Sequence, residues 1–180
     1  MIKNKETQKR YNLPTDVIFC KKCTISNQRP RISFDDEGVC SACNFSKVKN
    51  NEIDWGKREE ELVKLLDRFR KNDGSYDIIV PSSGGKDSAY IAHELKHKYG
   101  MNPLTVTWSP HLYTQIGWQN IQSMIHKGNL ANLLGTPAAR THRKLTKVFF
   151  ELLGDPFQPF IFGQTNFPLQ VSVNYNIPLV

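Results

Sequence analysis

The sequence predicts an α/β protein in which a parallel-sheet domain follows a small N-terminal module built around cysteines. From residue 76 onward, short apolar runs alternate with amphipathic segments, which is typical of βαβ units. All four cysteines lie between residues 20 and 43, in two Cys-x2-Cys pairs. A glycine- and serine-rich stretch, PSSGGKDS at 81–88, separates the first apolar run from the helix-like segment after it.

The composition sets broad limits on class and partners. The chain has 180 residues, 39% of them hydrophobic, which is enough for one domain and a small module. Residues 1–14 are polar, and no apolar run approaches the roughly 18 residues that span a bilayer, so we expect a cytoplasmic protein with no membrane partner. The net charge of +7 permits binding to nucleic acid, nucleotides or anionic sugars. Because the basic residues are spread along the chain, we interpret most of them as a solvated surface and expect no nucleic-acid partner.

Four segments follow from the sequence pattern. They are a polar arm at 1–19, the cysteine module at 20–45, a helical linker at 46–75 and the parallel-sheet domain at 76–180. Within the linker, apolar residues from Ile53 to Phe69 recur at roughly helical spacing, and Gly74 is suited to end that helix.

The sheet domain is expected to alternate strands and helices. In chain order these are a strand at 76–80, a helix at 87–100, a strand at 102–108, helices at 115–128 and 141–154, a strand at 157–163, a short helix and the start of another strand at 176–180. A parallel sheet normally needs cover on both faces, and the chain stops inside its last predicted strand. We therefore expect a C-terminally truncated piece of a longer protein.

The cysteine spacing predicts a metal site. Cys20 and Cys23 form one pair, Cys40 and Cys43 the other, and sixteen residues separate the pairs. Each pair can present two sulfurs to one tetrahedral ion from a tight turn, so the spacing predicts a structural zinc ribbon. Disulfides and a redox Cys-x2-Cys are the alternatives, but the sequence has no secretion signal and a redox site needs only one pair.

The glycine-rich stretch predicts an anion-binding turn between a strand and a helix. Gly84 and Gly85 allow a tight turn, and the helix that begins near Asp87 offers unpaired N–H groups and its positive dipole end. Hydroxyl donors and one cation complete the cradle: Ser82, Ser83, Ser88 and Lys86. Asp87 follows Lys86 where a Walker A loop has Ser or Thr, so this is not that loop. An ordinary strand–helix turn is the alternative.

The stretch SGGKDS at 83–88 resembles the PP-loop, SGGxDS, of the ATP pyrophosphatase superfamily, which has the adenine nucleotide alpha hydrolase-like fold. The resemblance implies that the loop holds the β- and γ-phosphates of ATP as a pyrophosphate leaving group while a substrate is adenylated. It gives Lys86 and Asp87 catalytic roles, and it places Asp87 where that family helps to hold Mg2+.

The segments CKKCTISNQRPRISFDDEGVCSAC (20–43), GMNPLTVTWSPHLYTQIGWQNIQ (100–122) and HRKLTKVFFELLGDPFQPFIFGQ (142–164) resemble the N-acetyl sugar amidotransferases of surface-polysaccharide, lipopolysaccharide and flagellin-glycan biosynthesis. The resemblance implies ATP-dependent amide or amidine formation on an acetamido sugar. It also implies ammonia from a HisH-like glutaminase subunit with a HisF-like partner. Two alternatives stay open: a tRNA-thiolating PP-loop enzyme, and an inactive fragment that binds zinc and ATP.

Further ligand contacts are expected near strand ends, because ligands of open parallel sheets bind beyond the carboxyl ends of the strands. Thr107 and Trp108 end one predicted strand, and Gly163, Gln164 and Thr165 follow another, where they resemble the glycine-containing turn of the superfamily near the adenylate. Arg143, which opens a predicted helix, is a further candidate. The superfamily places adenosine where Thr107 and Trp108 lie, and a buried aromatic is the alternative for Trp108. Arg143 can pair with a phosphate or a sugar carboxylate, or be a solvated helix charge.

Overall fold

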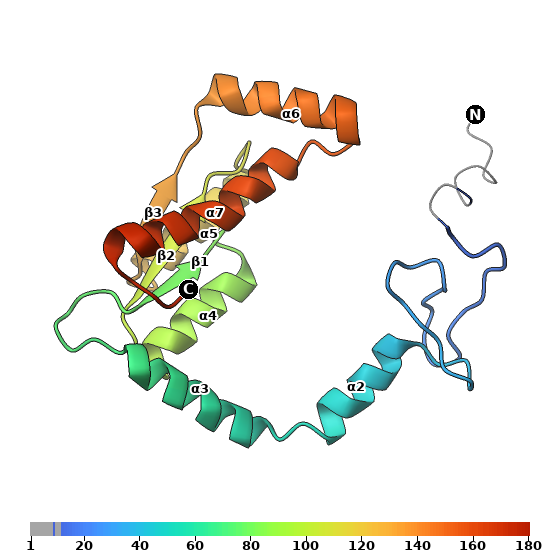
Figure 1. Ribbon diagram of the computed structural model, residues 1–180. Coiled ribbons are helices and arrows are strands. Elements are labelled where there is room, and N and C mark those ends of the chain that lie inside the picture. The colour runs from blue at the N-terminus through green and yellow to red at the C-terminus, as the bar shows by residue number, and fades with distance from the viewer. Residues whose placement is uncertain (1–8, 10–11) are drawn as a thin grey trace. The chain divides into compact units, whose positions relative to one another are not determined.

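The computed structural model describes Lys9 and residues 12–180. Most of the predicted polar arm, residues 1–8, 10 and 11, therefore lies outside the described residues. The chain divides into two compact units between Arg58 and Glu59, inside helix α3 (Trp55–Phe69) (Figure 1). In the described part of the chain, no helix is both long enough and apolar enough to cross a membrane.

The first unit is built on two short antiparallel bridges and one helix. Phe19 pairs with Ser26, and Phe34 pairs with Cys40, so each Cys-x2-Cys pair lies beside a small hairpin. Helix α2 (Ser41–Asn51) begins directly after the second bridge, and the Sγ atom of its N-cap Cys40 accepts a hydrogen bond from the Cys43 N–H. The buried centre of this unit is small and consists of Cys20, Val39 and Cys40.

The second unit contains a parallel sheet of three strands in the order β1-β2-β3. These strands are β1 (Ile78–Pro81), β2 (Pro103–Trp108) and β3 (Ala131–Gly135), and they pair in parallel register. Two crossover helices join them, α4 (Lys86–His97) and α5 (Gln115–His126). The predicted strands at 76–80 and 102–108 and the helices at 87–100 and 115–128 are confirmed, whereas β3 was not predicted.

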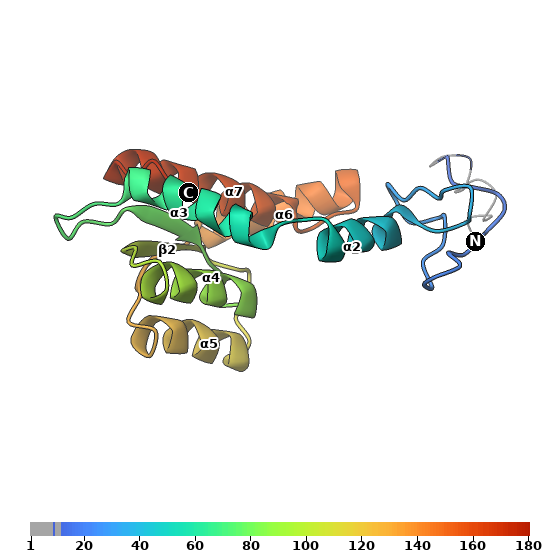
Figure 2. The same ribbon diagram turned by 90° about the horizontal axis from the view of Figure 1, so that it is seen from below.

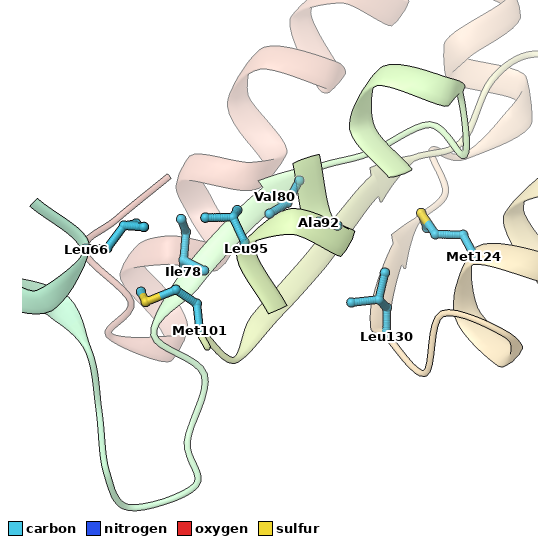
Figure 3. Close-up of a cluster of buried hydrophobic side chains, with 8 residues drawn as sticks. All are labelled: Leu66, Ile78, Val80, Ala92, Leu95, Met101, Met124 and Leu130. Carbon is cyan, nitrogen blue, oxygen red and sulfur yellow. The ribbon is translucent and has the colours of Figure 1, made fainter. Parts of the chain in front are cut away.

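Helices cover both faces of this sheet. Figure 2 shows α4 and α5 on one side, with α6 (Ala139–Leu153) and α7 (Gln158–Tyr175) on the other. Alternate residues of β1 enter the two cores, as a buried strand requires. Ile78 and Val80 pack with Leu95 and other side chains of α3–α5, as Figure 3 shows, and Ile79 packs in a cluster with Val171 of α7.

The expected strand at 157–163 is wrong. Most of these residues form the start of α7, and one continuous helix runs from Gln158 to Tyr175. The run FQPFIFG is short, aromatic and bounded by glycine, so its pattern cannot distinguish a strand from a buried helix segment. Pro159 lies in the first turn of α7, where a missing N–H removes no helical hydrogen bond. The predicted helix at 141–154 is confirmed as α6.

After α7 the chain returns to the outer edge of β1. The Ile79 N–H donates a 2.9 Å hydrogen bond to the Leu179 carbonyl, and Ile177 is buried against the sheet. Residues 177–180 thus lie beside β1 where the start of a strand was predicted, although they form no named strand. The chain first builds the sheet from β1 toward β3 and then reverses to the other side of β1. The carboxyl ends of these strands form the sheet edge at which open α/β sheets bind ligands.

Candidate functional site

The glycine-rich loop lies at the carboxyl end of β1, because Ser82–Gly85 directly follow β1 and precede α4. Gly84 has a positive φ of 74°, a conformation that favours glycine. A Cβ at this position would lie 2.4 Å from Cγ1 of Ile121 in α5. Both the backbone conformation and the close approach of α5 thus require a residue without a side chain here.

Ser82 holds the loop together from inside. Its backbone N–H bonds to the Val106 carbonyl of β2, and its hydroxyl oxygen accepts from the Gly84 N–H at 3.3 Å. The same hydroxyl lies 3.1 Å from the Ser88 hydroxyl and 3.2 Å from the sulfur of Met124. Ser82 is buried, so its first task is to fix the turn on the sheet.

The N-terminus of α4 is left open to a ligand. Its N-cap is Gly85, which provides no side-chain hydrogen bond to the first turn. Lys86 and Asp87 form the exposed start of the helix. The arrangement therefore presents backbone N–H groups, one cation and one carboxylate to solvent at the same point.

A small cavity of about 90 Å³, here called the loop hollow, lies beside this turn. Its lining brings together several of the predicted site residues: Ser82, Ser83, Ser88, Trp108 and Gln164. The volume equals that of roughly three water molecules, so it admits a small group and not a whole nucleotide. The exposed start of α4 would have to bind the rest of such a ligand.

Three other predicted residues have different surroundings. Thr107 is buried and its hydroxyl accepts from the Asn132 side chain at 2.9 Å. The expectation that Gly163–Thr165 form a turn after a strand is wrong, because they lie within α7. The Thr165 hydroxyl donates to the Ile161 carbonyl one helical turn earlier. Gly163 instead provides the close contact between α7 and Trp108.

Arg143 belongs to a second cavity, here called the α6 pocket. It lies beyond the carboxyl ends of β2 and β3, and its walls are residues 109–113 and 136–143, without residues 138, 140 and 141. Its volume is about 550 Å³. His111 and His142 stack within it, with ring centroids 4.3 Å apart. Burial, together with the nearby His111, lowers the pKa of His142 below its usual value, which favours the neutral imidazole.

The α6 pocket was not expected as a unit from the sequence. Its two sides come from segments about thirty residues apart, and only the parallel pairing of β2 with β3 brings them together. The available signal was one histidine in the loop after β2 and one near the start of α6, but the sequence pattern did not reveal that β3 exists.

A third cavity, of about 620 Å³, is mainly aliphatic and lies among α3, α4, β1 and the C-terminal residues. Lys98 is the cation on its wall, and this side chain already pairs with Glu59. The cavity therefore offers few groups that would bind phosphate.

The four cysteines form a compact cluster in the first unit. Their sulfur atoms all lie within 4.8 Å of one another, with 3.7 Å between Cys23 and Cys40 and 4.0 Å between Cys20 and Cys43. Four thiolates around tetrahedral zinc, at about 2.3 Å each, would lie about 3.8 Å apart. All four are free cysteines, and the cluster can bind a metal such as zinc.

Backbone N–H groups point at these sulfurs. Cys20 Sγ accepts from the N–H of Cys40 at 3.2 Å and of Lys22 at 3.3 Å. Burial raises the pKa of the Cys20 thiol, but these N–H groups outweigh it and lower that pKa to about 6. The neighbouring thiols of Cys23 and Cys40 raise the pKa of Cys43 to about 12. Such a cluster cannot ionise fully unless a cation compensates the charge.

Comparisons with known proteins add one relative. No protein-family model matches the chain. The chain is 31% identical over 97 residues to "Uncharacterized protein MJ1599" of Methanocaldococcus jannaschii. The aligned region covers 47% of this chain and 31% of that protein. The match thus spans about a third of the relative's length, and the name of the relative states no activity.

Proposed function

We propose that the chain is an ATP-dependent, AMP- and pyrophosphate-forming amidotransferase that acts on an N-acetyl sugar. The observation that carries the proposal is the SGGKDS turn at the carboxyl end of β1, the sheet edge at which open α/β sheets bind ligands. The uncapped N-terminus of α4 and the exposed Lys86 support an anionic ligand at this point.

The proposed chemistry takes place on ATP and the acceptor. An oxygen of the acceptor, from a carboxylate or an acetamido group, attacks the α-phosphorus, and the bond to pyrophosphate breaks. Ammonia then attacks the activated carbon, AMP leaves with the electron pair of the C–O bond, and the product is an amide or an amidine. No side chain of this chain forms a covalent bond to the substrate in these steps.

The loop residues have distinct tasks in this scheme. The N–H groups at the start of α4 and the Ser83 hydroxyl would bind the departing pyrophosphate, on which negative charge grows in the transition state. Lys86 would neutralise part of that charge. Asp87, exposed in the first turn of α4, would hold Mg2+, which supplies further charge compensation when bound.

We assign zinc to the cysteine cluster and a structural role to that zinc, because four thiolate ligands leave no open position for chemistry. The first unit has a very small buried centre, so metal binding would supply much of its folding free energy. The ammonia would come from a separate HisH-like glutaminase with a HisF-like subunit.

The test is a product assay with the intact chain, ATP, Mg2+, ammonia and a panel of acetamido sugars. We expect AMP and pyrophosphate in equal amounts, dependent on both sugar and ammonia. Lys86→Ala and Asp87→Asn should each reduce AMP formation by about tenfold or more. Lys64→Ala, at an exposed position of α3, is the charge-matched control and should leave the rate unchanged.

Other product patterns would contradict the proposal in different ways. AMP that requires tRNA and a sulfur donor would identify a thiolating enzyme. ADP and phosphate would indicate transfer of the γ-phosphoryl group, and ATP binding without AMP under every condition would indicate an inactive fragment.

A further inference from the structure

The α6 pocket lies next to the loop hollow along the same edge of the sheet. Trp108, the last residue of β2, lines the hollow, and Ser109 lines the pocket. The Ser109 N–H donates to the Gly135 carbonyl at 2.8 Å, which ties the start of the loop after β2 to the last residue of β3. With about 550 Å³, the pocket has the size of a small-molecule site.

The charges around this pocket favour an anion. None of the residues that line it is acidic. Arg143 contributes a guanidinium whose Nε contacts the Ala139 carbonyl at 3.4 Å, and its terminal nitrogens form no hydrogen bond with the described part of the chain. Helix α6 begins after Ala138 with no side-chain cap and no acidic residue in its first turn, so its positive end faces this region unneutralised.

Two buried polar atoms on the pocket wall have no hydrogen-bond partner among the described residues. They are Nε2 of His142 and the hydroxyl of Tyr113. His142 is 8% exposed, so most of its ring is buried in the wall of the pocket. Buried polar groups nearly always form hydrogen bonds in native proteins. Two such groups without a partner on one cavity wall indicate that a hydrogen-bonding ligand is missing there.

The remaining wall suits a sugar ring. Pro110, Leu112 and Pro137 supply apolar surface, and Tyr113 adds an aromatic ring with a hydroxyl. Sugars present C–H faces to such surfaces and hydroxyl groups to polar atoms at the edge. The pocket therefore combines a cationic end with an apolar wall. Because an inorganic ion would use only the cationic end, this combination favours an organic anion.

We propose that the α6 pocket binds the sugar acceptor through an anionic group, a carboxylate or a phosphate ester, held by Arg143 and the N-terminus of α6. This inference rests on the proposed function, because it places the acceptor beside the loop that would hold ATP. It assigns Arg143 to the acceptor and not to the nucleotide. His142 and Tyr113 contact the sugar next to its anionic group.

Histidine NMR tests the pocket without any turnover. The chain has five histidines, and His111→Gln and His142→Gln variants assign two of their ring signals. Glucuronate, N-acetylglucosamine 1-phosphate, neutral N-acetylglucosamine and inorganic phosphate are titrated separately, with and without ATP and Mg2+. We expect a charged sugar to shift the signals of His111 and His142 and to leave those of His93, His97 and His126 in place.

Matched variants then locate the charge. Arg143→Gln should weaken binding of the charged sugar by about tenfold or more. Lys144→Gln, which removes the same charge one residue further along α6 and outside the pocket wall, should change it by less than about twofold. The arm with glucuronate and the arm with the sugar phosphate distinguish a carboxylate from a phosphate ester.

Several results would overturn the proposal. It would be overturned if Arg143→Gln and Lys144→Gln weakened binding of the charged sugar equally, or if the neutral sugar bound as tightly as the charged ones. Binding of inorganic phosphate as tight as that of either charged sugar would also overturn it, and so would the absence of any binding. Binding with the expected shifts but no AMP formation would retain the pocket and reject the proposed reaction. If AMP forms and Arg143→Gln leaves the KM for the acceptor unchanged, the proposed reaction would be retained and the pocket rejected as the acceptor site.

Discussion

The indole ring of Trp108 lies directly against the backbone of Gly163. A Cβ added to Gly163 would lie 2.1 Å from both Nε1 and Cε2 of this ring, closer than any real contact. Trp108 also packs against Phe167 one turn later, with ring centroids 5.4 Å apart. Together these contacts dock α7 on the carboxyl end of β2, beside the loop hollow.

Gly163→Ala should destabilise the protein, although alanine is the better helix former by about 1 kcal/mol. Because the methyl group overlaps the indole ring, we expect a net loss of about 1–3 kcal/mol in the free energy of unfolding, measured by urea denaturation. The same substitution in a Trp108→Leu background should cost less, since the ring is gone. A net gain in stability in the otherwise native chain would contradict the contact.

Gly84→Ala and Gly74→Ala form a matched pair. Both glycines have positive φ, near +74° and +80°, so both substitutions incur the backbone cost of about 1 kcal/mol. Only Gly84 meets a neighbour, Ile121, whereas nothing lies within 4 Å of a Cβ at Gly74. We expect Gly84→Ala to lose a further 1–3 kcal/mol or so in urea unfolding. If the two substitutions lowered the free energy of unfolding equally, Ile121 of α5 would not be in close contact with Gly84.

Replacing Cys40 by serine should remove the metal and unfold the first unit. Elemental analysis of the purified chain should find about one equivalent of zinc, and cobalt substitution should give the visible absorption of tetrahedral thiolate coordination. Both signals should vanish in Cys40→Ser and persist in Thr24→Ala, an exposed neighbour of Cys23. Full metal content in the serine variant would exclude the four-cysteine site.

His142 should make stability depend on pH. Its pKa in the folded chain lies below the ordinary value of 6.5, because burial and His111 disfavour the charged ring. The unfolded chain therefore binds more protons below about pH 6.5, and stability falls as the pH drops from there through the lowered pKa. Above this window His142 contributes no pH dependence.

The measurement is urea unfolding at several pH values between 5 and 8, roughly the range in which histidines titrate. His142→Gln keeps a neutral side chain at every pH, so its stability should fall less steeply on acidification than that of the unchanged chain. Parallel pH profiles in the two proteins would show that the buried ring is not responsible.

The features that sequence reasoning predicted are local ones. Two Cys-x2-Cys pairs imply a cluster because each pair sits in one turn, and their sulfurs do converge. The turn after β1 was recognised because its glycines, its hydroxyls and the start of α4 are consecutive in the chain. In both cases the residues that act together are also neighbours in sequence.

The features that it missed depend on distant contacts. The strand β3 is a five-residue run that is only partly buried, and its pairing with β2 becomes evident only in the sheet. The expected strand at 157–163 was wrong because an aromatic run suits a strand equally well, and the fit of Gly163 under Trp108 depends on tertiary packing. The α6 pocket was missed for the same reason, because the rings of His111 and His142 come into contact only when β3 pairs with β2.

The hydrogen bond between Ile79 and Leu179 has a consequence for the order of folding. It joins residues about one hundred positions apart, while β1, β2 and β3 pair over much shorter separations. Closing the longer loop costs more chain entropy, and the contacts that offset this cost form only after the sheet and α7 exist. The edge of β1 should therefore close last, and in pulsed hydrogen exchange during refolding the Ile79 amide should gain protection after the amides of β2.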